Sequence, residues 1–136
     1  MNTKNTNPTF DEKTIKETIE KVFNAICDAF GRSDLIGAAD HFSNRPDMVK
    51  ISNGHVLKGK EQMLAYWTKK IEELKGITIT IELGSLQQIK EDCLWTIADE
   101  TISAPGAQMK AVVSNIFIRE DNRWKILLDH TTYVNS

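Results

Sequence analysis

The sequence is short of the features that would assign it to several specialised protein classes. It has two cysteines, Cys27 and Cys93, which lie in apolar segments without a second cysteine or histidine at metal-ligand spacing. We expect both to be buried thiols of a protein in a reducing compartment, the cytoplasm. No apolar run approaches the roughly 18 residues of a membrane span, and residues 1–10 lack the apolar segment of a signal peptide.

The charges exclude a second group of functions. Seventeen lysine and arginine residues stand against nineteen aspartate and glutamate residues, which gives a net charge of −2 and no cationic excess for binding nucleic acid. The three histidines lie in separate segments without the spacing of a metal site. We therefore expect no metal, no cofactor, no nucleic-acid partner and no membrane partner.

The length and composition of the chain are those of one soluble domain. The chain has 136 residues, of which 40% are hydrophobic and 26% charged. A chain of this length buries enough apolar surface to fold without disulfides or a metal ion. We expect residues 1–9 to be a disordered tail and residues 10–136 to form a single domain.

The first half of the chain carries the spacing of helices. Apolar residues recur every three or four positions between Ile15 and Phe30, which predicts an amphipathic helix that begins at a capping box, Thr9 to Glu12, and ends at Gly31. A short second helix follows, capped by Ser33. A third helix is predicted between residues 59 and 75, with residues 67 and 74 on its apolar face.

Strands are predicted between the second and third helices and throughout the second half. Asn53-Gly54, between two short β-prone segments, predicts a hairpin over residues 48–57. Alternating apolar residues predict a strand over 77–83 with a bulge at Gly84-Ser85, and further strands over 93–103, 108–119 and 123–133. The short connections favour an antiparallel meander, so the fold class is α+β, with helices against one face of a curved sheet.

Two segments give the sequence a family resemblance. Residues 57–63, Leu-Lys-Gly-Lys-Glu-Gln-Met, and residues 121–132, Asp-Asn-Arg-Trp-Lys-Ile-Leu-Leu-Asp-His-Thr-Thr, resemble the entry to the third helix and the closing strand of SnoaL-like domains, within the nuclear-transport-factor-2-like (NTF2-like) superfamily. The resemblance covers residues 10–134. It implies a cone of three helices on a strongly curved, mostly antiparallel sheet, with a pocket between them and a homodimer formed through the sheet. It does not imply one function.

The side-chain alternation of strands predicts which residues line this pocket. Because an unpaired lysine is costly to bury, we place the faces that carry Lys110 and Lys125 outward. The inward residues are then Asn115 and Phe117 on one strand, and Trp124 and His130 on the next. In the strand over 93–103 either Asp99 or Glu100 faces the helices, and we favour Asp99, together with Trp95. Trp67, Trp95 and Trp124 line the pocket in one interpretation and pack in the core or dimer interface in the other.

The resemblance also suggests a mechanism that this sequence does not match. Ketosteroid isomerase, a member of the superfamily, uses a general-base aspartate, a phenol and a protonated aspartate. The base position falls near Ser52-Asn53, the first predicted helix has no tyrosine, and the strand acid falls at or beside Asn115. An amide cannot transfer a proton, so the isomerase mechanism is not expected.

Two functions stay open at this point. The first is a pocket that binds a small, mostly apolar molecule without catalysis. The second is an isomerase, cyclase or dehydratase that uses Asp99 or His130 as acid or base on a carbonyl compound, where the alternative for each residue is a structural role. On the second hypothesis, a His130→Ala variant would lose turnover and keep its fold.

Overall fold

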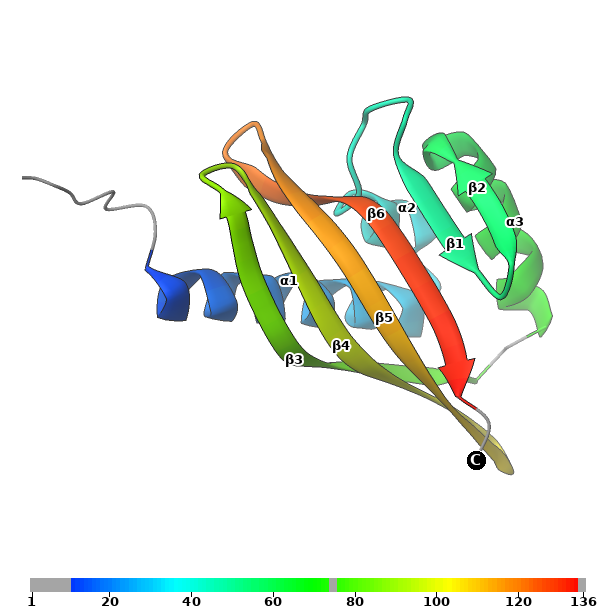
Figure 1. The fold of residues 1–136 in the computed structure, drawn as a ribbon. Coiled ribbons are helices and arrows are strands. Elements are labelled where there is room, and N and C mark those ends of the chain that lie inside the picture. Colours follow the sequence, from blue (N-terminus) through cyan, green and yellow to red (C-terminus); the bar gives the residue numbers. More distant parts are fainter. Residues whose placement is uncertain (1–10, 74–75, 135–136) are drawn as a thin grey trace, which may run out of the picture.

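The computed structural model describes residues 11–73 and 76–134, and in them the chain forms three helices and six strands in the predicted order (Figure 1). The tail predicted over residues 1–9 lies outside these residues, as do Leu74 and Lys75 of the third predicted helix. The elements, in chain order, are α1 (Glu12–Gly31), α2 (Leu35–Ala39), β1 (Val49–Ser52), β2 (His55–Lys58), α3 (Gly59–Glu73), β3 (Thr78–Lys90), β4 (Cys93–Ala104), β5 (Ala107–Glu120) and β6 (Arg123–Val134).

One mixed sheet contains all six strands in the order β2-β1-β6-β5-β4-β3. Neighbouring strands are antiparallel except β1 and β6, which are parallel. The four long strands β3 to β6 form the predicted meander, and they bend along their length while α1 crosses one face (Figure 1). The α+β fold with a mostly antiparallel, curved sheet is confirmed.

The local signals at the helix and hairpin ends are confirmed in part. Asp11 is the N-cap of α1, accepting a hydrogen bond from the backbone N–H of Lys13 at 3.1 Å, whereas the sequence placed the cap at Thr9, which lies outside the described residues. Asp34, not Ser33, caps α2. Asn53 and Gly54 both have positive φ, as the predicted hairpin turn requires.

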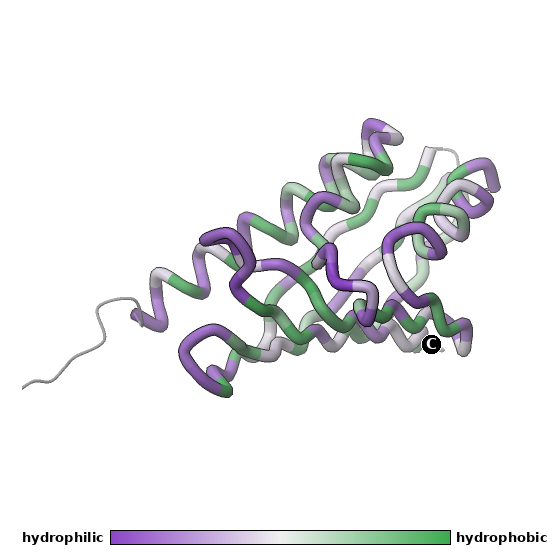
Figure 2. The backbone as a smooth tube through the Cα atoms, turned by 90° about the horizontal axis from the view of Figure 1, so that it is seen from above, coloured by the Kyte–Doolittle hydropathy of each residue, from purple (hydrophilic) through white to green (hydrophobic). Residues whose placement is uncertain are grey.

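The core lies between α1 and the face of the sheet that it covers, called here the inner face. Ile15, Ile19, Phe23 and Ile26 form the buried stripe of α1, and Figure 2 shows apolar and polar residues alternating along this helix. Buried partners on the sheet include Leu94, Ala98, Phe117, Trp124 and Ile126. Each fully buried leucine, isoleucine or phenylalanine side chain contributes about 1.5–3 kcal/mol to the free energy of unfolding.

Three register shifts interrupt the regular alternation of the sheet. Two lie between β3 and β4, and the one at Gly84 confirms the bulge predicted there, while the other falls at Ile89. The third lies between β5 and β6, where Ile116 pairs with Leu128 and Phe117 with Ile126, so that Leu127 is the extra residue. The bulge at Leu127 reverses which residues of β6 face inward, and it decides the composition of the site described next.

Candidate functional site

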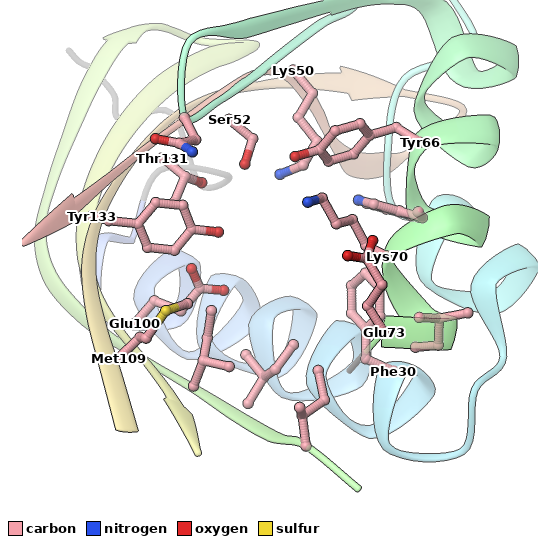
Figure 3. Close-up of a pocket in the computed structure, with 16 residues that line it drawn as sticks. Phe30, Lys50, Ser52, Tyr66, Lys70, Glu73, Glu100, Met109, Thr131 and Tyr133 are labelled. Carbon is pink, nitrogen blue, oxygen red and sulfur yellow. The ribbon is translucent and has the colours of Figure 1, made fainter. Parts of the chain in front are cut away.

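A cavity of about 430 Å³ opens between α1, α3 and the inner face of the sheet (Figure 3). Its walls are mostly apolar, with aromatic and isoleucine side chains from α1, α3, β4, β3 and the segment that leads into β3. Its polar side chains come from β1, β4 and β6 on one side and from α3 on the other. The apolar residues include Phe30, Trp67, Ile71, Ile77, Ile79 and Ile102.

Trp67 is the central residue of the apolar wall. It is 6% exposed, and its ring makes edge contacts with Phe30 at 4.8 Å and Phe42 at 5.5 Å between centroids. These three rings join α3 to α1 and to the segment after α2. Such edge-to-face packing is a favoured aromatic arrangement, and it stabilises the orientation of the rings where α3 meets the cavity.

The polar floor of the cavity is built on a buried ion pair. Lys50 of β1 donates to Asp129 of β6 at 2.9 Å, and their side chains are 13% and 9% exposed. The two residues are direct neighbours in the parallel β1–β6 pair. Asp129 also accepts hydrogen bonds from the amide of Asn115 at 2.9 Å and the hydroxyl of Thr131 at 3.2 Å. A buried ion pair needs such additional donors, because desolvation costs each ion several kcal/mol.

This pairing keeps Lys50 charged. Burial lowers the pKa of Lys50, but the charge and hydrogen bond of Asp129 outweigh that effect, so the pKa lies above its ordinary value. A lysine held in this way is a poor nucleophile and a stable cation. Its remaining N–H groups can donate hydrogen bonds within the cavity.

Glu100 of β4 is the carboxyl group whose proton affinity the site changes most. The pKa of Glu100 is raised to about 7, mainly by burial and also by the charge of Asp129, while the charge of Lys50 acts in the opposite direction. Figure 3 shows Glu100 and Tyr133 directed into the cavity from the sheet, with Tyr66 and Lys70 opposite them on α3. A carboxyl group with a pKa near 7 can both accept and donate a proton at neutral pH.

The structure brings Trp67 and Asn115, of the predicted residues, to this site. Trp67 lines the cavity. Asn115 is 1% exposed and supports Asp129. Phe117 is inward, as predicted, but it lies in the core against Phe23, at 5.8 Å between ring centroids. Trp124 is also buried on the inner face, and Arg119 stacks over its ring at 5.5 Å; neither Phe117 nor Trp124 lines the cavity.

The predicted orientations of Asp99, Trp95 and His130 are wrong. Asp99 is exposed and Trp95 half-buried on the outer face, while Glu100 faces the cavity. The inner positions of β4 hold Leu94, Thr96 and Ala98, which are buried, so the large residues that seemed to mark the inner face lie on the other side of the strand.

His130 is exposed because of the bulge at Leu127. Trp124 and Ile126 face inward as the alternation predicts, but the extra residue moves Asp129 and Thr131 inward and turns His130 outward. Lys50 and Asp129 were therefore missed. Their opposite charges on two β-prone segments were the available signal, but the sequence did not show that these strands are neighbours.

No group of three metal-ligating side chains lies together in the described parts of the chain. Within the same residues, no helix has the length and apolar character needed to cross a bilayer.

Comparison with known proteins gives the family. The pattern that defines SnoaL-like domains matches residues 19–135. The chain belongs to this family. Among curated proteins, none matches this SnoaL-like domain significantly.

Solved structures share the fold of this SnoaL-like domain. An NTF2-like protein of unknown function from Shewanella oneidensis superposes with a TM-score of 0.79 at 18% identity, covering 86% of this chain and 98% of its own. A provisionally named dehydratase of the NTF2-like family from Streptomyces avermitilis gives 0.73 at 17% identity, over 93% and 100%. A ketosteroid isomerase-like protein from Erwinia carotovora atroseptica superposes with a TM-score of 0.73 at 15% identity, covering 93% of this chain and 100% of its own. At such identities the likeness concerns the fold alone.

Proposed function

We propose that this SnoaL-like domain binds a small, mostly apolar molecule that carries one or two polar groups. The observation that supports the proposal is the cavity of about 430 Å³, whose aromatic and aliphatic wall faces a polar floor built on Lys50 and Asp129. Small-molecule sites in proteins combine these two kinds of surface, since apolar contact supplies affinity and a few polar groups fix orientation.

The ketosteroid isomerase mechanism is not part of this proposal. Ser52, which lies at the expected position of the general base, lines the cavity but cannot abstract a carbon-bound proton. Asn115 occupies the region of the strand acid and donates to Asp129 instead of holding a transferable proton. The helix α1 has no tyrosine, and the phenols of the cavity come from α3 and β6.

Native mass spectrometry of the freshly purified protein tests the binding proposal. We expect a co-purified compound that is released on denaturation. An Ile79→Trp variant, which fills the cavity from its wall, should lose the compound. A Thr80→Trp variant, which places the same ring on the outer face of the same strand, should retain it. Retention by both variants would place the compound elsewhere. Absence of a compound, together with no calorimetric binding of indane, would overturn the proposal.

A second candidate function is supported by Glu100. We propose an isomerase-, cyclase- or dehydratase-type reaction in which Glu100 exchanges a proton with a carbonyl compound, in place of Asp99 and His130, which are both exposed. The supporting observation is the carboxyl group with its pKa raised to about 7 inside the cavity. General acid–base catalysis is most effective when the pKa of the group lies near the working pH.

Deuterium exchange of a model ketone tests this reaction. We expect the protein to accelerate exchange of the hydrogens next to the carbonyl group of indan-1-one in D₂O, followed by NMR. Glu100→Gln should reduce the protein-dependent rate by about 100-fold or more, while Asp99→Asn and His130→Ala leave it unchanged. An unchanged rate in Glu100→Gln would show that Glu100 is not the base.

We also propose that the domain forms a homodimer through the outer face of its sheet. An apolar patch, called here the outer patch, crosses β4, β5 and β6; Ile97 is 40% and Val112 37% exposed within it. Trp95 pairs with Ile116, and Ile116 with Leu128, so these half-buried residues are contiguous with it. A contiguous apolar face of this kind is typical of an interface.

A cytoplasmic location is proposed from the cysteines. Cys27 and Cys93 are both free thiols, and burial raises the pKa of Cys27 to about 12, so it stays protonated and unreactive. Unpaired thiols are typical of reducing compartments. Subcellular fractionation tests the location.

A further inference from the structure

A small inner chamber of about 40 Å³ adjoins the cavity. The two spaces share five lining residues, among them Lys50, Glu100 and Thr131, and the chamber is also lined by Asn115, Asp129 and apolar side chains of α1, β3, β5 and β6. A volume of this size holds about one water-sized group. Because lining residues are shared, a molecule seated in the cavity can extend a single polar group into the chamber.

Asn115, one of the residues that line this chamber, carries an acceptor without a partner among the described residues. Its amide nitrogen donates to Asp129 at 2.9 Å and to the carbonyl oxygen of Leu128 at 3.3 Å, which fixes the orientation of the amide. The amide oxygen, Oδ1, is buried and has no hydrogen-bond partner among the described residues. Buried polar atoms are nearly always hydrogen-bonded, and leaving one without a partner is unfavourable. A group bound in the chamber could satisfy this oxygen by donating a hydrogen bond to it.

Lys50, by contrast, favours a bound group that accepts a hydrogen bond. One of its three N–H groups is directed to Asp129, and the side chain lines both spaces, so it can also donate to a group bound there. A ketone oxygen or a carboxylate can accept from Lys50 but cannot donate to Asn115. A hydroxyl group can do both.

We propose that the inner chamber receives a hydroxyl group of the bound molecule, so that the cavity selects small apolar alcohols over hydrocarbons and ketones of the same shape. This inference rests on the proposed binding function. The hydroxyl oxygen accepts from Lys50, and its hydrogen is donated to Oδ1 of Asn115.

Thr96 offers a different partner for the amide oxygen of Asn115. It pairs with Asn115 across β4 and β5, and its hydroxyl oxygen is also buried without a partner among the described residues. A rotation of this hydroxyl toward Asn115 would satisfy the amide oxygen and remove the need for a ligand donor. A Thr96→Val variant separates the two explanations, because it removes that hydroxyl and keeps the shape of the side chain.

Calorimetric titration of the full-length protein with three matched probes tests the inference. Indan-1-ol, indane and indan-1-one share one ring system and differ in the polar group. We expect indan-1-ol to bind at least about tenfold more tightly than the other two. Asn115→Leu, of similar volume, should reduce this preference to about twofold or less, and Thr96→Val should leave it unchanged.

Each alternative outcome has a distinct meaning. Equal affinity for the three probes would overturn the hydroxyl preference while supporting the binding function. Failure of all three to bind would overturn both. A hydroxyl preference that appears or grows only in Thr96→Val would assign the amide oxygen of the unaltered protein to Thr96 and overturn the inference. If Asn115→Leu does not fold, the ranking of the probes on the unaltered protein decides the question.

Discussion

Glu100 and Asp99 are consecutive residues with opposite environments. Asp99 is exposed on the outer face, whereas Glu100 faces the cavity beside Asp129 and Lys50. Both are acids on one strand, and the side of the sheet on which each carboxyl group lies determines its chemistry. Substitutions at Glu100 can therefore be compared with matched substitutions at Asp99, which serve as the control.

The pKa of Glu100 predicts how stability depends on pH. Folding raises this pKa from 4.5 to about 7, so between these values the folded protein holds a proton that the unfolded chain has released. The free energy of unfolding should fall as pH rises through this window. Glu100→Gln removes the effect, and we expect it to stabilise the protein by on the order of 2 kcal/mol at pH 8 and little at pH 4.5.

Urea unfolding at the two pH values measures this difference. Asp99→Asn should change stability by the same small amount at both. A Glu100→Gln variant whose stability relative to the unaltered protein does not change with pH would show that the carboxyl group titrates normally in the folded state.

At the scale of elements, β6 explains why part of the site could be predicted and part could not. The period of two correctly placed Trp124 and Ile126 inward, and the Gly84 bulge of β3 had a visible glycine signal. The bulge at Leu127 has no such signal, since leucine fits a regular strand equally well. One undetected extra residue exchanged His130 for Asp129 on the inner face.

The parallel β1–β6 pair depends on the ion pair between its strands. Lys50→Met would leave the carboxylate of Asp129 buried with hydrogen bonds but no cation, and we expect it to lower the free energy of unfolding by about 3 kcal/mol. The double variant Lys50→Met/Asp129→Asn removes both charges and should recover part of the loss. A double-mutant cycle in urea measures the coupling. Additive effects of the two substitutions would show that the pair is not coupled.

At the scale of the whole molecule, the fold was accessible from the sequence because it rests on many independent signals. The stripe of α1, the Asn53-Gly54 turn and the alternation of the long strands each specify one element. An error at one residue leaves the others intact, so the architecture survives where the site assignment does not. A site depends on the direction of a few side chains, and it has no such redundancy.

The outer patch predicts the oligomeric state. Ile97→Lys places a charge in the proposed interface and should weaken the dimer by about two orders of magnitude. Ile36, which is 72% exposed on α2, offers the control, and Ile36→Lys should leave the dimer unchanged. Sedimentation velocity over a range of concentrations distinguishes these states. A monomeric unaltered protein, or a dimer that tolerates Ile97→Lys, would contradict the proposed interface.

The position of β1 beside β6 also sets an order for folding. Lys50 and Asp129 are 79 positions apart, whereas β3 to β6 pair with consecutive neighbours. Closing the longer loop costs more entropy, so we expect the meander to form in the transition state and β1 to dock afterwards. In stopped-flow experiments Ile51→Ala should mainly accelerate unfolding, and Val113→Ala should mainly slow refolding. The floor of the cavity is then the last part to assemble, and a ligand can be captured only by a chain that has completed its fold.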